Sequence, residues 1–245
     1  VPLLSVRDGG NDVLDGINLD LCAGEVVAIA GLEGSGKGLL ARALFGVAPF
    51  TRGSMTVQGR PLRPPNPRAA IRAGIGYVSD DRKAEGLALH QSVLENAVLA
   101  LRGIGNLLAR PATRTGRREV ADVLRDVDVR AVDYSQQIRL LSGGNQQKTV
   151  LARWLALSPA LLVCAEPTRG IDVAAKAAIY RLLRNYADGG KAVLAVTSDL
   201  PEAIGVADRL LVMRGGRIVA EFSAGASEEA AMAVATGHQP TGLVA

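Results

Sequence analysis

The sequence predicts an α/β fold, a mainly parallel sheet with helices on both faces and a helical insert at about residues 85–150. Three observations predict it. Short apolar runs of the length of buried strands alternate with longer stretches whose apolar residues recur at helical spacing. A glycine-rich loop separates one such run from a helix-like stretch. Between Ser92 and Leu157 helix-like stretches follow one another with no strand-like run between them.

Apolar alternation and the positions of glycine and proline set the expected elements of the first third. Alternating isoleucine and leucine predict a half-buried strand, whereas a continuous β-branched run predicts a buried parallel strand. Gly46 is expected to end the helix behind the glycine-rich loop, and Asn66-Pro67 to begin the next helix. The expected strands are 17–21, 26–30, 55–57 and 75–78, and the expected helices are 37–45 and 67–74.

Capping residues divide the middle of the chain. Ser92 and Glu95 have the spacing of a capping box, and Gly103 is expected to end that helix. Apolar residues repeat at helical spacing over 116–129. A third helix is expected behind Ser142, running to Leu157.

The last third returns to strands alternating with helices. Asp172 is placed to cap one helix, and Gly215-Gly216 to turn a hairpin. The expected strands are 161–165, 192–197, 210–213 and 217–222, and the expected helices are 173–187 and 200–206. We expect residues 1–236 to form the domain and residues 237–245 a loose tail.

Composition excludes several classes of protein. The 245 residues are 48% apolar, which suffices for a sizeable core in one large or two small domains. A net charge of +4 is too mild to indicate nucleic-acid binding. No apolar run approaches the roughly 18 residues that a membrane span needs. The start at Val1 lacks an initiator methionine and signal-peptide features, so we expect a piece of a longer cytosolic polypeptide.

The two cysteines, Cys22 and Cys164, both lie in apolar stretches. We therefore expect two buried free thiols in a reducing compartment rather than a disulfide.

The loop from Gly31 to Gly38 matches seven of the eight positions of a phosphate-binding P-loop, between a predicted strand and a predicted helix. Its glycines allow backbone N–H groups to converge on phosphate oxygens, and Lys37 would reach the β- and γ-phosphates. On this segment alone, a plain strand-to-helix turn remains the alternative.

Two further segments carry chemistry. Ser142-Gly143-Gly144, opening a helix, offers a hydroxyl and bare N–H groups to an anion; a flexible linker turn is the alternative. Glu166 ends an apolar strand, where it could orient or deprotonate an attacking water. Taken alone, it would be a surface glutamate at a strand end.

Together these segments resemble the ATP-binding cassette (ABC) ATPases, the energy-coupling subunits of ABC transporters. The phrases at 81–83, 141–148 and 166–173 look like the carboxy-terminal cassette of tandem ATPases in monosaccharide importers of the ribose, galactose and xylose type. The resemblance covers about residues 1–222 and implies a P-loop NTPase (RecA-like) core, an antiparallel β subdomain and an α-helical signature subdomain.

The resemblance also implies residue roles. It makes the glycine-rich loop the Walker A motif, the Ser142 turn the signature and Glu166 the catalytic glutamate. Asp80 takes the Q-loop position, Asp172 lies in the D-loop and Ser198 takes the H-loop place. The residues implied in nucleotide binding are Gly31, Glu33, Gly34, Ser35, Gly36, Lys37, Gly38, Leu39, Asp80, Ser142, Gly143, Gly144, Asn145, Gln146, Asp172 and Ser198.

The departures from the family pattern concern magnesium. Gly38 replaces the Ser or Thr, and Ala165 the Walker B Asp, that hold Mg²⁺ in the family. Ser198 replaces the usual histidine, Asp80 stands where glutamine is common, and no aromatic residue near 5–15 can stack on adenine. We assign no metal ligand and expect ATP binding with poor hydrolysis at this Walker site, because Mg²⁺ stabilises phosphoryl transfer by several kcal/mol.

The resemblance implies the second nucleotide-binding domain of an importer for a sugar or a similar solute such as a nucleoside. Its partners would be a second cassette, from the amino-terminal half of the same polypeptide, membrane permease subunits and, indirectly, a solute-binding protein. It would lie peripherally on the cytoplasmic side of the cell membrane and bind no nucleic acid. A non-hydrolysing scaffolding cassette is a rival; a cassette of DNA repair or translation is disfavoured by the short helical insert without long heptads.

Overall fold

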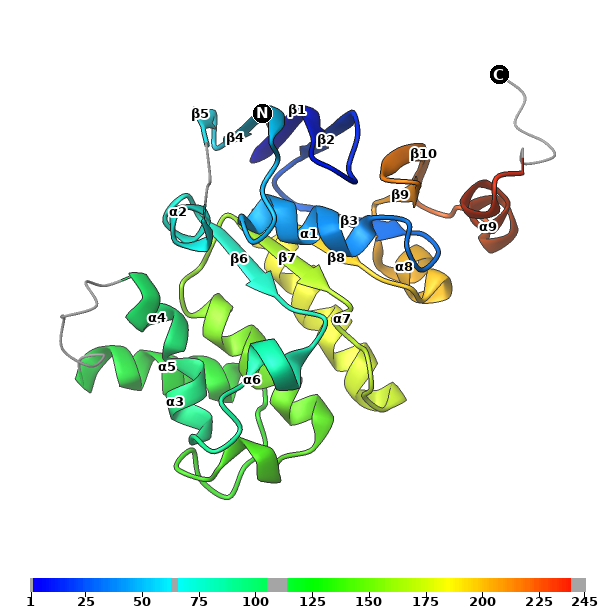
Figure 1. Ribbon diagram of the computed structural model, residues 1–245. Helices are drawn as coiled ribbons and strands as arrows, with labels where there is room; N and C mark the ends of the chain where they lie inside the picture. The colour runs from blue at the N-terminus through cyan, green and yellow to red at the C-terminus, as the bar shows by residue number, and fades with distance from the viewer. Residues whose placement is uncertain (1, 63–65, 105–113, 239–245) are drawn as a thin grey trace. The chain divides into compact units, whose positions relative to one another are not determined.

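The computed structural model describes residues 2–62, 66–104 and 114–238 (Figure 1). The chain forms two compact units. The core unit comprises Val1–Tyr77, Ala160–Glu166 and Leu183–Ala245, and the helical unit comprises Val78–Pro159 and Pro167–Leu182.

Six strands of the described chain form the central sheet, in the order β10-β9-β3-β8-β7-β6. β3 runs parallel to both of its neighbours, β8 and β9, and β7 runs parallel to β8. β9 and β10 form the antiparallel hairpin that Gly215-Gly216 predicts. The strands are β3 (Glu25–Ala30), β6 (Ile75–Val78), β7 (Leu161–Ala165), β8 (Ala192–Val196), β9 (Arg209–Arg214) and β10 (Arg217–Ser223).

A second, antiparallel sheet also belongs to the core unit, with the order β2-β1-β4-β5 among the described strands. The sequence predicts β2 and β4 but misses β1, whose Leu4 and Val6 are fully buried. The strands are β1 (Leu4–Gly10), β2 (Ile17–Leu21), β4 (Arg52–Val57) and β5 (Arg60–Pro61).

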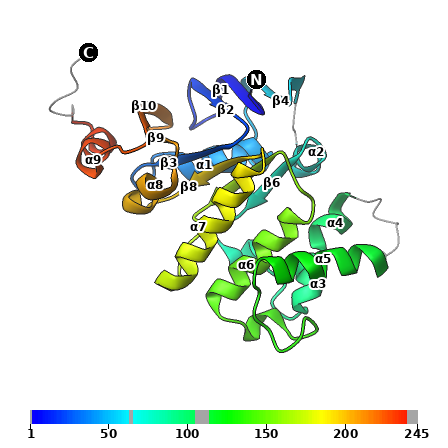
Figure 2. The same ribbon diagram turned by 180° about the vertical axis from the view of Figure 1, so that it is seen from behind.

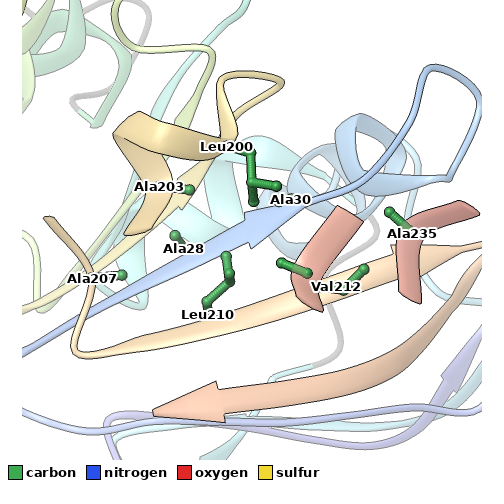
Figure 3. Close-up of a cluster of buried hydrophobic side chains, with 9 residues drawn as sticks. Ala28, Ala30, Leu200, Ala203, Ala207, Leu210, Val212 and Ala235 are labelled. Atoms are coloured by element: carbon green, nitrogen blue, oxygen red, sulfur yellow. The ribbon is translucent and has the colours of Figure 1, made fainter. Parts of the chain in front are cut away.

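Helices α8 (Leu200–Val206) and α9 (Glu228–Thr236) pack on one face of the central sheet, where alanines keep the layers close (Figure 3). Ala203 of α8 and Ala235 of α9 lie over small and branched side chains of β3 and β9. The sequence misses α9, although Ser227 caps it by accepting the Ala230 N–H. The other helices of this unit, α1 (Lys37–Phe45) and α2 (Pro67–Arg72), begin where predicted. The residues of α7 (Val173–Asp188) are divided between the two units after Leu182.

The helical unit contains α3 (Val93–Ala97), α4 (Leu99–Ile104), α5 (Arg114–Asp126) and α6 (Gly143–Leu155), which Figure 2 shows together. One prediction is wrong here: the helix behind Ser92 breaks at Val98, and Gly103 lies inside α4. Ser92 accepts the Glu95 N–H as expected. The Glu95 carboxylate, however, pairs with Arg102 at 2.5 Å and Arg117 at 2.6 Å, because two guanidinium groups compete with the backbone for it.

A buried polar network joins α6 to α3. Arg153 is 8% exposed and donates from Nε to the Asn96 carbonyl oxygen at 2.8 Å. Burial lowers the pKa of Arg153 to about 10. The side chain of Asn96, itself fully buried, accepts from the Ala88 N–H and donates to the Ala88 carbonyl. These bonds hold the helix behind Ser142 against its neighbours.

The thiol prediction is half wrong. Cys164 is buried and free, and burial raises its pKa. Cys22 is free but exposed, because it follows the last inward residue of β2 and lies at the start of a turn. Most of the tail predicted at 237–245 lies outside the described residues. No helix in the described ranges has the length and apolarity to cross a membrane.

Candidate functional site

The loop between β3 and α1 has a backbone suited to phosphate. Gly34 and Gly36 adopt left-handed conformations, with φ of 78° and 95°, which favour glycine. Lys37 is the first residue of α1 and only 7% exposed. The Ser35 hydroxyl is buried without a hydrogen-bond partner in the described chain. A buried donor without a partner costs about 1–3 kcal/mol, so this group is suited to an incoming acceptor.

The hairpin turn between β9 and β10 holds this loop in place. The Gly216 N–H donates to the Ser35 carbonyl at 2.9 Å. A methyl group on Gly31 would lie 2.5 Å from the Met213 carbonyl oxygen, and one on Gly36 would lie 3.1 Å from the Gly216 Cα. These glycines therefore have two roles: they belong to the phosphate-binding pattern, and they leave room for the neighbouring hairpin.

Glu166 and Ser198 meet in the core unit. Glu166 follows β7 directly, with a left-handed φ of 46°, and its N–H donates to the Val196 carbonyl at 2.7 Å. The Ser198 hydroxyl donates to Glu166 Oε1 at 2.6 Å. Ser198 also lines a cavity of about 40 Å³ together with Gly31 and Leu32. The core unit thus brings Ser198 to the P-loop and holds the Glu166 carboxylate by one oxygen.

Gly38 and Ala165 stand at the two positions where the family pattern places the magnesium ligands. Gly38 is exposed and has open space where a side chain would begin. Ala165 presents a methyl group that is 2% exposed. Neither glycine nor alanine carries a side-chain oxygen, which is the ligand that this ion prefers.

The Ser142 turn opens α6 in the helical unit. Ser142 caps the helix, and its hydroxyl accepts from Asn145 Nδ2 at 3.0 Å. Asn145 Oδ1 in turn accepts the Arg130 N–H at 2.9 Å, and Gln146 Nε2 donates to the Leu141 carbonyl at 3.1 Å. Side chains on both sides therefore support the turn that presents the hydroxyl.

Packing explains the two glycines of this turn more directly than ligand access does. A methyl group on Gly144 would lie 2.7 Å from the Ala175 Cβ of α7. One on Gly143 would lie 2.8 Å from Arg82 Nη2 and 3.2 Å from the Gly170 carbonyl oxygen. Access for an anion, expected from the sequence, is therefore not needed to explain them. Protein neighbours thus crowd both positions, more severely at Gly144 than at Gly143, where the nearest atom is the far end of the flexible Arg82 side chain.

The remaining predicted residues are separate from these clusters. Asp172 caps α7, because its Oδ1 accepts the Ala175 N–H at 2.9 Å, and Asp80 is half-buried two residues beyond β6. Glu33 is exposed on the P-loop and Leu39 is half-buried in α1. Arg82, which has no predicted role, contacts the 169–170 loop and lies against the signature turn. Its acceptors lie 87 and 88 residues away, so no local pattern could reveal it.

Comparison with protein families matches residues 14–169 to the model described as ABC transporter. The chain belongs to the ABC transporter family. The loop from Gly31 to Gly38, the Ser142 turn and Glu166 lie within the matched range.

Curated relatives of this cassette include the ribose import ATP-binding protein RbsA 1 of Rubrobacter xylanophilus, 42% identical over 96% of the chain and 48% of the relative. Another is a putative ribose/galactose/methyl galactoside import ATP-binding protein of Agrobacterium fabrum, 41% identical over 91% of the chain and 45% of the relative. The chain therefore spans about half the length of the curated relatives it matches.

Solved structures share the fold. A nucleotide-free ATP-binding cassette from an ABC transporter superposes with a TM-score of 0.81 at 20% identity, covering 91% of this chain and 92% of the other. The cassette MJ0796, in a dimeric post-hydrolysis state bound to ADP and Pi, superposes with a TM-score of 0.76 at 22% identity, covering 91% of this chain and all of the other. These likenesses confirm the predicted P-loop NTPase fold.

Proposed function

We propose that this chain is the second nucleotide-binding domain of an ABC importer for a sugar or similar small solute. Its signature completes a nucleotide site on a partner cassette, while its own Walker site binds ATP and hydrolyses it poorly. One observation carries the proposal: side chains on both sides support the signature turn, whereas positions 38 and 165 carry no magnesium ligand.

The relatives support the importer role and the partner. Their names describe import of ribose or galactose, and they are about twice as long as this chain. A second cassette in the same polypeptide would account most simply for the additional length of these relatives. MJ0796, which shares the fold, is dimeric in its post-hydrolysis state. A membrane permease and, indirectly, a solute-binding protein complete the proposed assembly, with the cassette on the cytoplasmic side of the cell membrane.

At the chain's own site, the cradle would hold phosphate oxygens through backbone N–H groups, the Ser35 hydroxyl and Lys37. Glu166 would orient a water molecule, but one of its carboxylate oxygens already accepts the Ser198 hydroxyl. Mg²⁺, where it is held, neutralises charge that develops on the phosphates. Here no side chain at 38 or 165 can hold it, so we propose ATP binding without efficient turnover.

At the partner's site, the signature would supply the Ser142 hydroxyl and the N–H groups of the first turn of α6. These donors would face a γ-phosphate that the partner's P-loop holds. Preorganised donors of this kind stabilise transition-state charge, and losing one costs about 10²–10³ in turnover. The bonds from Asn145 keep the hydroxyl in place before nucleotide arrives.

The rival function is a scaffolding cassette whose nucleotide holds the partner closed without any turnover. It shares the P-loop with the first proposal but requires no catalytic contribution from Ser142. The complete ATPase, assembled with its permease, distinguishes the two functions.

The test compares Ser142→Arg with Lys37→Ala in that complete ATPase. Ser142→Arg places bulk where the partner-held phosphate must approach and should abolish ATP turnover and uptake. Lys37→Ala should reduce turnover much less, because the site that it serves lacks both magnesium ligands. Thermal melting of each variant checks the fold. Equal losses would show that both sites turn over, and a fully active Ser142→Arg protein would rule out partner completion.

A further inference from the structure

Arg82 joins three segments of the helical unit that are far apart in sequence. Its Nη1 donates to the Arg169 carbonyl oxygen at 2.6 Å, and its Nη2 donates to the Gly170 carbonyl oxygen at 3.2 Å. The same Nη2 would lie 2.8 Å from a methyl group on Gly143. One guanidinium group thus holds the loop before Asp172 and lies against the first residue of α6.

The backbone at Arg82 is itself held in place by neighbouring residues. It begins a π-helical turn, Arg82–Gly86, which Asp81 caps by accepting the N–H groups of Lys83 and Ala84 at 3.1 and 2.9 Å. At the end of the turn, a methyl group on Gly86 would lie 3.7 Å from Val150 Cγ2 of α6. The Arg82 side chain therefore extends from a turn that packs on the signature helix.

The acceptors explain why arginine stands at this position. Two carbonyl oxygens of adjacent residues accept two different nitrogens of the planar guanidinium, so one rigid group fixes the direction of the loop. A lysine ammonium is a single point of charge and would not fix both carbonyls in the same way. Gly170 has a left-handed φ of 68°, which turns its carbonyl within this short loop.

We propose that Arg82 is a positioning residue for the signature. Its guanidinium holds the 169–170 loop against the start of α6, so that the Ser142 turn and Asp172 keep one arrangement toward nucleotide on a partner cassette. Arg82 acts through these segments and not on the nucleotide. The inference rests on the function proposed above, in which the signature completes the partner's site.

The experiment measures ATP turnover of the complete importer ATPase with Arg82→Ala, Arg82→Lys and a matched control, Lys83→Ala. Lys83 is the next residue, is exposed, and carries the same charge. We expect Arg82→Ala to lower kcat at least about tenfold, equivalent to about 1.4 kcal/mol of barrier. KM for ATP should stay within about twofold, because the partner's P-loop holds the nucleotide. Lys83→Ala should leave both constants unchanged.

Chemical rescue distinguishes positioning from general loosening of the fold. Arg82→Ala leaves a space the size of a guanidinium group beside the two carbonyls, so added guanidinium chloride, at concentrations well below denaturing, should restore part of kcat. It should not stimulate the wild type or Lys83→Ala. If Arg82→Ala melts below the assay temperature, Arg82→Lys replaces it, with the expected loss in kcat at unchanged KM.

Ser142→Arg in the same assay separates the two proposals. If Ser142→Arg abolishes turnover while Arg82→Ala and Arg82→Lys keep wild-type kcat, the positioning role is overturned and the proposed function stands. If Ser142→Arg retains turnover, the proposed function fails. A fall in kcat of Arg82→Ala that guanidinium does not restore, together with a lowered melting temperature, would also overturn the positioning role.

Discussion

The P-loop and the signature are both glycine-rich turns at the start of a helix, yet they differ in which side chains of the family pattern they retain. The P-loop keeps its left-handed glycines and Lys37 but has Gly38 where a hydroxyl would hold a metal. The signature keeps its hydroxyl, and Asn145 holds that hydroxyl in place. A phosphate cradle is built mainly from backbone N–H groups, whereas a magnesium site depends on single side chains, so the function proposed above requires the first without the second.

The two turns also differ in the space around their glycines. A methyl group on Gly38 would meet nothing within 4 Å, whereas one on Gly144 would lie 2.7 Å from the Ala175 Cβ. The same substitution is therefore expected to have opposite effects on stability at the two positions.

The largest expected effect is at Gly144. Gly144→Ala should lower the free energy of unfolding by about 1–3 kcal/mol, because two rigid methyl groups would overlap. Ala175→Gly in the same chain removes the second methyl group and should recover part of the loss. Urea unfolding of the chain measures both variants. A Gly144→Ala protein as stable as the wild type would show that α7 can shift away from α6.

The next prediction rebuilds the magnesium site. The wild-type chain should bind ATP with less than about a tenfold gain from Mg²⁺, or about 1.4 kcal/mol, by titration calorimetry. Gly38→Ser with Ala165→Asp should exceed that gain, because both ligands return to a cradle that is otherwise retained. Gly38→Ala with Ala165→Asn is the matched control without the hydroxyl and the charge. No larger gain in the double variant would mean that the loop does not place residue 38 beside the phosphates.

A smaller effect is expected at Gly38. Gly38→Ala should stabilise the chain by about 0.5–1 kcal/mol, because alanine favours helix over glycine and no neighbour obstructs its methyl group. Urea unfolding measures the free energy of unfolding of this variant, which is then compared with that of Gly144→Ala. A destabilised Gly38→Ala protein would contradict the open space seen at this position.

The smallest expected effect is on the pH dependence of stability. The Arg117 guanidinium, with Arg102 beside it, lowers the pKa of the Glu95 carboxyl from its ordinary value of 4.5. A lowered pKa in the folded state stabilises the helical unit above the ordinary value, and this contribution disappears as pH falls through the lowered one. Glu95→Gln should therefore melt a little below the wild type near neutral pH.

That difference should shrink in acid. The exposed Glu119→Gln, on α5, serves as the control for the removal of one carboxylate and should melt with the wild type. A difference in melting temperature between Glu95→Gln and the wild type that is constant with pH would mean that the two ion pairs contribute nothing.

Local signals explain which elements the sequence could predict. Helix α1 was predicted from end to end, because Gly36 and Gly46 mark both of its limits with left-handed backbone. Asp172 caps α7 as predicted, because an aspartate directly before a helix accepts a backbone N–H group of the first turn. The P-loop and the signature were recognised because their chemistry requires contiguous residues.

The missed features depend on distant partners. Strand β1 alternates only over the four residues Leu4 to Arg7, too short a run to stand out, and its extent is fixed by pairing with β2 and β4. The break at Val98 follows no glycine or proline, and Glu95 was expected to face its own backbone rather than two arginines. The bonds of Arg82 to carbonyls 87 and 88 residues away are beyond any local pattern.

The acceptors of Arg82 also determine how the two loop positions can vary during evolution. A carbonyl oxygen is present whatever the side chain, so the bond to residue 169 places no demand on the identity of that residue. Gly170 is constrained by its left-handed backbone instead. Covariation between positions 82 and 169 is therefore expected to be weak even though the two residues are hydrogen-bonded. Substitutions at Arg169 offer a way to change the charge of this surface without breaking the bond beneath it.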